Sequence, residues 1–154
     1  ELPPMQALLA RDYPAYTSAL TEIRAAVRQA CLGAGCDEET IAAWVLAVNE
    51  ACMNVIQHAY HFAEGQALRI EVGLVGDELV TLICDNGIPA RIEDLQPRAL
   101  DDLRPGGLGV HFIRELTDTM AYLLPGDGWQ NRLRLGKRID TTGAAATSQG
   151  KEPA

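Results

Sequence analysis

The chain has 154 residues, of which 47% are hydrophobic and 22% charged, so we expect a folded domain with a sizeable core rather than a disordered polypeptide. Its formal net charge of -8 argues against nonspecific binding to nucleic acid phosphates or to an anionic membrane surface. The sequence has no run of about 18 uncharged apolar residues and no signal-peptide pattern at its start, so a cytoplasmic protein is expected.

The first half of the chain is predicted to hold one strand and two helices. Residues 5–11 form a short apolar run that we interpret as a strand, although a run of this length does not settle its type. A helical period with one apolar face covers residues 14–32 and ends at Gly33. Asp37 follows as an N-cap, with two glutamates in the next turn, and begins a second helix that continues to about residue 60.

The second half is predicted to hold two hairpins, one helix and a disordered tail. Residues 140–154 contain no large apolar side chain, so we expect them to be disordered and place a single domain over residues 1–139. The elements predicted within this half are strands over 68–75 and 79–84, a loop or lid over 88–105, a helix over 107–119, and strands over 120–124 and 129–135.

The four cysteines show no CxxC spacing; they are Cys31, Cys36, Cys52 and Cys84. We interpret them as reduced cysteines that pack as small hydrophobic side chains. A zinc or redox site is the second interpretation.

The second predicted helix places three polar side chains along one stripe. With a rotation of about 100° per residue, Asn54 lies about 40° and His58 about 80° from Glu50, and the apolar side chains fall on the opposite side. No Lys or Arg occurs over residues 37–60, and the neighbours of the stripe are small or apolar. A helix that faces bulk water usually carries mixed charges, so we favour a stripe covered by a ligand or lid over an ordinary solvated face.

The residue types on this stripe suit phosphoryl transfer. The Asn54 side-chain oxygen is a neutral hard ligand of the kind that binds Mg²⁺ together with phosphates and water. Glu50, one turn earlier, could accept the proton of an attacking hydroxyl. His58 has two interpretations of equal weight, support of phosphate binding or a hydrogen bond to a backbone carbonyl.

Asp85 directly follows the apolar run over residues 79–84 and therefore lies where a strand ends. A carboxylate at this place can accept a hydrogen bond from the exocyclic amine of adenine, and Gly87 would let a purine approach the backbone. The alternative is an Asp-Asn-Gly turn with no ligand. Only the combination with the other motifs favours the nucleotide.

Gly106, Gly107, Leu108 and Gly109 form a glycine-rich segment that opens the predicted helix. Free backbone amides at a helix start can meet phosphate oxygens, whereas a flexible connecting loop is the alternative. The segment is not a P-loop, because no Gly-Lys-Ser or Gly-Lys-Thr follows it.

The order of these motifs resembles the GHKL ATPase superfamily, and within it the bacterial anti-sigma-factor serine kinases. Residues 50–60 resemble the N box of that group, residues 85–89 its G1 box and residues 105–114 its G2 box. The resemblance implies an α/β two-layer sandwich, the GHKL or Bergerat ATP-binding fold, in which helices cover one face of a mixed, largely antiparallel sheet.

The resemblance also implies ATP and Mg²⁺ as cofactors. Glu50 would be the general base, Asn54 the Mg²⁺ ligand and Asp85 the adenine acceptor. Asn131 stands where this group usually has a Gly-Thr pair whose hydroxyl helps to bind adenine, and we expect the amide to substitute for it. Arg104 has two interpretations, a contact with the γ-phosphate or a partner, or a solvated lid arginine. The other expected ATP contacts are His58, Gly87, Pro89, Gly106, Gly107, Leu108, Gly109 and Val110.

The function implied by this resemblance is a serine kinase that phosphorylates a small STAS-type anti-anti-sigma protein and, in an alternative complex, restrains a sigma factor. A homodimer is expected, as in related kinases. A noncatalytic ATP-binding switch that sequesters a partner is the first alternative. The catalytic domain of a sensor histidine kinase is a weaker one, because no histidine precedes His58 to serve as a phosphoacceptor.

Overall fold

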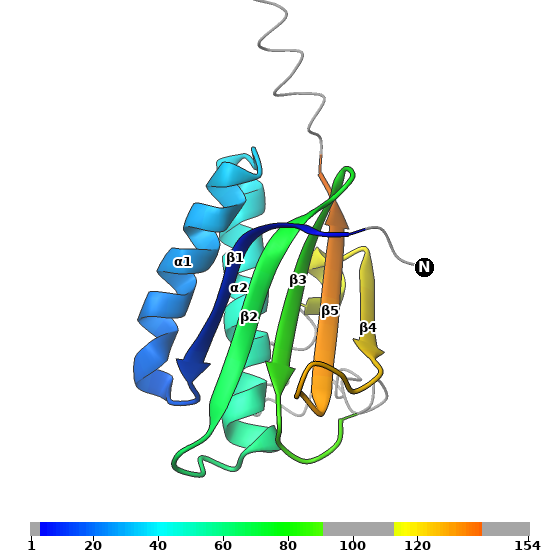
Figure 1. Ribbon diagram of the computed structural model, residues 1–154. Coiled ribbons are helices and arrows are strands. Elements are labelled where there is room, and N and C mark those ends of the chain that lie inside the picture. The colour runs from blue at the N-terminus through cyan, green and yellow to red at the C-terminus, as the bar shows by residue number, and fades with distance from the viewer. Residues whose placement is uncertain (1–3, 91–112, 140–154) are drawn as a thin grey trace, which may run out of the picture.

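A single antiparallel sheet with helices on one face makes up the fold (Figure 1). The structure, a computed structural model, describes residues 4–90 and 113–139. Five strands lie in the order β1-β2-β3-β5-β4, and every pairing between them is antiparallel. The strands are β1 (Gln6–Pro14), β2 (Ala67–Val75), β3 (Glu78–Asp85), β4 (Thr119–Leu123) and β5 (Asn131–Arg138). The predicted two-layer sandwich is confirmed.

The helical layer consists of α1 (Leu20–Gly33) and α2 (Glu38–Asn54), both on the same face of the sheet (Figure 1). A short 3-10 turn, Thr17–Ala19, precedes α1. None of the helices in the described part of the chain is long and apolar enough to cross a membrane. Residues 113–116 are helical, as the predicted third helix requires, whereas most of the predicted lid and the tail over 140–154 lie outside the described residues.

The first helix begins later than the sequence pattern predicts. Residue 14 was expected to start it, but Pro14 still belongs to β1 and pairs with Ala67 of β2. The buried ring of Tyr13, 2% exposed, anchors this end of the strand opposite Leu68. Because these sheet contacts continue to residue 14, the chain turns into α1 only after it leaves the sheet edge.

The second helix has the predicted extent, but its last turn is π-helical instead of α-helical. Asp37 caps it, since its Oδ1 accepts a hydrogen bond of 2.8 Å from the backbone amide of Thr40. After Asn54 the chain forms a π-helical turn, Val55–Ala59, closed by the bond from Tyr60 N to Val55 O at 2.9 Å. Such turns insert one extra residue and often occur at functional sites.

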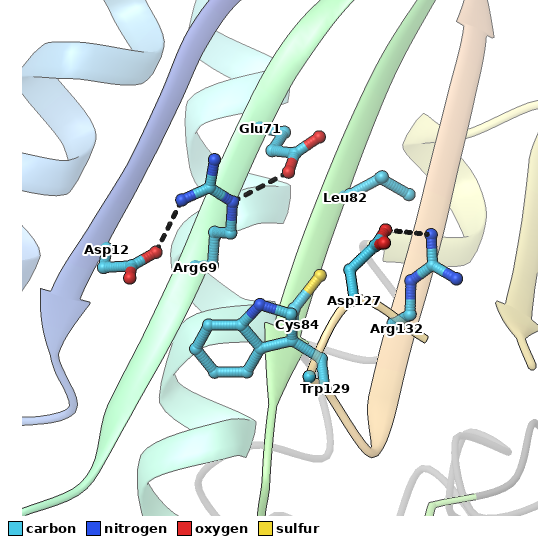
Figure 2. A pocket seen from close by; sticks show the side chains of 9 residues that line it. Asp12, Arg69, Glu71, Leu82, Cys84, Asp127, Trp129 and Arg132 are labelled. Carbon is cyan, nitrogen blue, oxygen red and sulfur yellow. Dashed lines mark hydrogen bonds and ion pairs between the residues drawn. The ribbon is translucent and has the colours of Figure 1, made fainter. Parts of the chain in front are cut away.

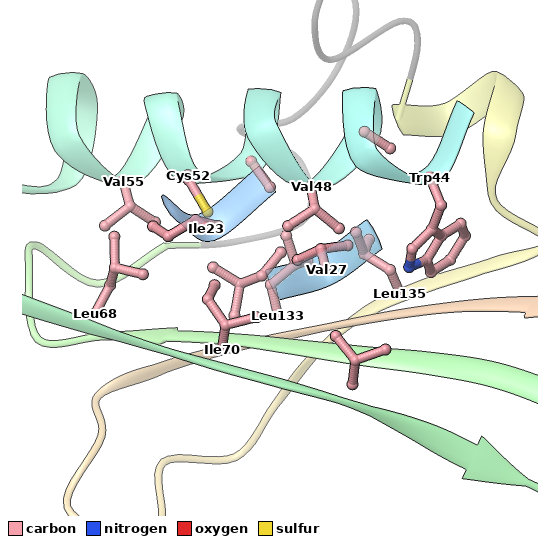
Figure 3. Close-up of a cluster of buried hydrophobic side chains, with 14 of the residues drawn as sticks. Ile23, Val27, Trp44, Val48, Cys52, Val55, Leu68, Ile70, Leu133 and Leu135 are labelled. Carbon is pink, nitrogen blue, oxygen red and sulfur yellow. The ribbon is translucent and has the colours of Figure 1, made fainter. Parts of the chain in front are cut away.

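The core lies between the helices and the sheet (Figure 3). Val48 and Cys52 of α2 point toward the sheet, where Ile70 of β2 meets them, and all three side chains are at most 1% exposed. Trp44 and Thr81 add a polar contact inside this core: the indole Nε1 donates a 2.8 Å hydrogen bond to Thr81 Oγ1, and both residues are fully buried. This bond ties α2 to β3.

Replacing Trp44 with Phe should destabilise the fold by about 1–3 kcal/mol, because Thr81 Oγ1 would lose its partner in the core. Urea denaturation measures the free energy of unfolding. Adding Thr81→Val should restore part of the loss, since both polar partners are then removed. Leu124→Ala, at a side chain 84% exposed, is the matched control and should change little. No recovery in the double variant would show that lost packing, not the hydrogen bond, accounts for the effect.

Candidate functional site

A buried carboxylate and a buried amide face each other at one end of the sheet. Asp85, the last residue of β3, and Asn131, the first residue of β5, are direct cross-strand partners, and each is 3% exposed. Asn131 Nδ2 donates a 2.8 Å hydrogen bond to Asp85 Oδ1. The backbone amide of Gly87 donates to the same oxygen, also at 2.8 Å. Both bonds fix the orientation of the carboxyl group.

The second oxygen of Asp85 has no comparable support. In the described ranges, no residue donates a hydrogen bond to Oδ2. Burial raises the pKa of this carboxyl group above its ordinary value, while the hydrogen bonds from Asn131 and Gly87 act in the opposite direction. A buried carboxylate whose second oxygen receives no hydrogen bond from the described residues is well suited to accept one from a ligand amine.

Asn131 also holds the segment that follows the Asp85 turn. Its Nδ2 donates to the carbonyl of Ile88 at 2.9 Å, and its Oδ1 accepts from the backbone amide of Ala90 at 2.8 Å. The side chain therefore uses its amide oxygen and its amide nitrogen within the protein. Pro89 lies between these two contacts and is exposed.

Asn86 is clamped from both sides, which the sequence did not reveal. Its backbone amide donates to Tyr60 Oη at 2.6 Å, and Tyr60 in turn donates to the carbonyl of Ala67 at 2.7 Å. The side chain of Asn86 accepts from Gln130 N at 2.8 Å and donates to Gly128 O at 3.1 Å. The Asp-Asn-Gly motif indicated a turn at this place, but no sequence pattern near Tyr60 predicted its hydrogen bond with Asn86.

Gly87 is packed against the end of the π-helical turn. A Cβ atom at this position would lie 2.5 Å from the carbonyl oxygen of Ala59, and the next amide, Ile88 N, donates to that oxygen at 3.1 Å. This backbone contact by itself requires glycine at the position, and the expected approach of a purine to Gly87 stays a prediction. The contact brings the end of β3 and the end of the α2 segment together.

The predicted stripe on α2 is only partly covered. Ala47 and Ala51, which flank it on one side, are 0% and 2% exposed, whereas Leu46 on the other flank is 41% exposed. Glu50 and Asn54 are half-buried, and His58, within the π-helical turn, is exposed. The expected cover by a ligand or lid stays a prediction, because most of the predicted lid lies outside the described residues.

Asn54 carries an unsatisfied polar atom. Its side-chain Nδ2 is buried and has no hydrogen-bond partner among the described residues. Such an orphaned group costs free energy, which a bound ligand would recover. An asparagine amide also presents an oxygen, the ligand type that Mg²⁺ prefers. On the same helix, Glu50 forms neither an ion pair nor a hydrogen bond with any residue of the described ranges. Both residues fit a nucleotide with its cation.

Six expected contact residues cannot be placed in this site. Arg104 and the glycine-rich segment lie outside the described residues, so their expected roles stay predictions. The six residues outside the described part of the chain are Arg104, Gly106, Gly107, Leu108, Gly109 and Val110.

A separate cavity of about 480 Å³ lies on the face of the sheet away from the helices (Figure 2). Its lining includes an ion-pair ladder in which Arg69 contacts Asp12 at 2.7 Å and Glu71 at 2.8 Å, next to Cys84 and Trp129. None of the residues predicted to contact ATP or Mg²⁺ lines this cavity. The two faces of the sheet therefore differ in chemistry.

Comparison with known sequences gives the family context. Residues 13–137 match the family described as histidine kinase-like ATPase domain. The serine-protein kinase RsbW of Bacillus subtilis is 33% identical over 81 residues, which are 47% of this chain and 51% of that protein. RsbW of Bacillus mycoides is 30% identical over 86 residues, 51% of this chain and 53% of that protein. The chain thus spans about half the length of the curated relatives it matches.

Comparison with solved structures supports the fold. The crystal structure of the SiaB-SiaC complex from Pseudomonas aeruginosa matches 88% of this chain and 90% of its own chain, with a TM-score of 0.59 and 18% identity. The RsbU and RsbW domains of a Mycobacterium tuberculosis protein match 84% of this chain and 32% of theirs, with a TM-score of 0.54 and 19% identity. At these identities the likeness concerns the fold alone.

Gly87→Ala should destabilise the protein by about 1–3 kcal/mol, because the new Cβ would collide with the Ala59 carbonyl unless the turn moves. Urea denaturation measures the loss. Gly33→Ala is the matched control: the nearest atom to its new Cβ is Leu8 Cδ2 at 3.8 Å, an ordinary contact, so stability should not fall. Equal stability of both variants would contradict the close approach of β3 and the π-helical turn.

Proposed function

The chain belongs to the histidine kinase-like ATPase domain family, and on that basis we propose that it is an ATP-dependent serine protein kinase of the anti-sigma type. The single observation that carries the proposal is the juxtaposition of the buried Asp85–Asn131 pair with the end of the α2 segment, where Asn54 has an unpartnered buried amide. The curated relatives, named serine-protein kinases, support the same activity.

Asp85 is proposed to hold the adenine ring. Its unsupported Oδ2 can accept a hydrogen bond from the exocyclic amine, which guanine does not present at that position. Asn131 would act indirectly, by fixing the carboxyl group and the backbone of Ile88, instead of contacting adenine through a hydroxyl. Gly87 and Pro89 would form the adjoining wall of the base site.

Asn54 and Glu50 are proposed to act at the phosphates. ATP, when bound, supplies the γ-phosphoryl group, and Asn54 would hold Mg²⁺ through its amide oxygen. Glu50 lies one helical turn earlier on the same stripe and carries no ion pair with the described residues, so it is available to accept the proton of a serine hydroxyl. His58 would support phosphate binding from the π-helical turn.

The phosphate-binding glycine segment is proposed on resemblance alone. Gly106, Gly107, Leu108, Gly109 and Val110 would offer backbone amides to the phosphates, because a helix start concentrates free N–H groups. Arg104, just before this segment, would contact the γ-phosphate or an acidic surface of the partner.

The protein substrate is proposed to be a small STAS-type anti-anti-sigma protein, with a sigma factor as the second target and a homodimer as the active form. The resemblance to anti-sigma-factor serine kinases supports this assignment. A neighbour of the same fold was solved as the SiaB-SiaC complex, which supports a protein partner for this chain.

Glu50→Gln should abolish phosphoryl transfer, with a loss of about 10²- to 10⁴-fold, because the neutral amide cannot take the serine proton. Binding of ATP should stay nearly unchanged. The measurement is transfer of labelled phosphate from ATP to a STAS-type protein, with Glu39→Gln on the first turn of α2 as the control. Wild-type protein that binds ATP but labels no such partner would contradict the kinase proposal and favour the noncatalytic switch.

Asp85→Asn should weaken ATP binding about tenfold or more, because an amide NH₂ in place of Oδ2 would face the adenine amine. The fold should not suffer, since the buried charge disappears. The folded pKa of Asp85 is raised above its ordinary 3.8, so the wild type loses stability as the pH rises from 3.8 through that raised value.

The stability of Asp85→Asn relative to wild type should therefore increase across the same pH window and then level off. Calorimetry measures the ATP affinity, and urea denaturation below and above this window measures the stability. Unchanged ATP affinity would mean that the adenine site lies elsewhere.

A further inference from the structure

The connection between α1 and α2 brings two cysteines together. Cys31 lies in the last turn of α1, and Cys36 directly precedes the cap of α2. The backbone amide of Cys36 donates to the carbonyl of Cys31 at 3.1 Å, and Gly35 N donates to Leu32 O at 3.0 Å, with Gly35 at a φ of 86°. These two bonds and the left-handed glycine define a Schellman motif.

In a Schellman motif, the two residues joined by the outer hydrogen bond usually touch through apolar side chains. Here both of these residues are cysteines, and the backbone hydrogen bond of 3.1 Å from Cys36 N to Cys31 O holds them next to each other. Cys31 is fully buried and Cys36 is half-buried, so Cys36 is the more accessible residue of the pair. This difference in exposure suits an attacking thiol at Cys36 and a resolving thiol at Cys31.

The pKa shifts of the two thiols agree with Cys36 as the attacking group and Cys31 as the resolving group. The neighbouring Cys31 thiol lowers the pKa of the Cys36 thiol, although burial and the nearby Asp37 carboxylate oppose the shift. The neighbouring Cys36 sulfur, together with burial, raises the pKa of Cys31. Burial raises the pKa of Cys52 to about 12 and that of Cys84 to about 11. Thiolate character is therefore concentrated on Cys36.

We propose that Cys31 and Cys36 form an oxidation site that closes to an intramolecular disulfide when the protein meets a hydroperoxide. The Cys36 thiolate attacks one peroxide oxygen, the O–O bond breaks, and Cys36 becomes a sulfenic acid while hydroxide (from hydrogen peroxide) leaves. The Cys31 sulfur then attacks the Cys36 sulfur, and the sulfenic hydroxyl leaves as water with the proton of the Cys31 thiol. The two sulfurs together lose two electrons, which the peroxide takes up.

The position of the pair makes the disulfide compatible with the native fold. The Schellman bonds already hold the two backbone segments together, so the cross-link closes a contact that exists before oxidation. It would fix the point at which α1 ends and α2 begins. Oxidation should accordingly raise the thermal midpoint of the protein rather than lower it.

The test is to expose the native protein to hydrogen peroxide, denature it, alkylate the remaining thiols and digest with trypsin. The peptide over residues 29–69 contains Cys31, Cys36 and Cys52 and no internal Lys or Arg. After oxidation it should lose two hydrogen atoms and carry one alkyl group, on Cys52. Free thiols titrated in denaturant should fall from four to two.

Three variants separate the roles of the cysteines. In Cys31→Ala, the sulfenic acid of Cys36 should accumulate and react with dimedone, since no resolving thiol remains. Cys36→Ser should keep its three thiols at the same peroxide dose. Cys84→Ser, the matched control outside the pair, should fall from three thiols to one.

Two results would overturn the proposal. One is a wild-type protein that keeps all four thiols while glutathione in the same tube is oxidised. The other is a disulfide that joins Cys52 or Cys84, or two separate chains, instead of Cys31 and Cys36. Both readouts are independent of ATP binding and phosphoryl transfer, so they do not depend on the proposed kinase activity.

Discussion

The hydrogen bond between Asp85 and Asn131 is the interaction on which the candidate site depends. Sheet register sets these residues opposite each other at the ends of β3 and β5, and burial makes the charge on Asp85 costly. The bond supports one carboxyl oxygen and leaves the other without a donor among the described residues. Burial of this carboxylate costs stability, and the proposed contact with a nucleotide gives a functional reason to keep an acid at this position.

The second constraint is the close approach of Gly87 to Ala59, which links this acid to the end of the α2 segment. Ile88 N bonds the same carbonyl, and Tyr60 holds the neighbouring amide of Asn86. These contacts join one end of the sheet to one end of the helical layer. The unpartnered amide of Asn54 lies just before this junction, so the proposed base and cation sites adjoin the same set of contacts.

The sequence predicted what depends on local pattern and missed what depends on distant contacts. Alternating apolar residues predicted the hairpins, Asp37 predicted the start of α2, and the position of Asp85 after an apolar run predicted its place at a strand end. The π-helical turn was not predictable from a helical wheel, and it changes the direction of His58 relative to Glu50. The buried bond from Trp44 to Thr81 and the cavity around Trp129 depend on segments far apart in the chain.

ATP is proposed to bind between Asp85 and α2, on the helical side of the sheet. Titrating ATP and Mg²⁺ into ¹⁵N-labelled protein tests it directly, because side-chain amides and indoles give separate NMR signals. The account predicts that the side-chain amide signals of Asn54 and Asn131 shift, while the indole signal of Trp129, on the opposite face, stays in place. Shifts confined to the Trp129 indole, or no shifts at all, would contradict it.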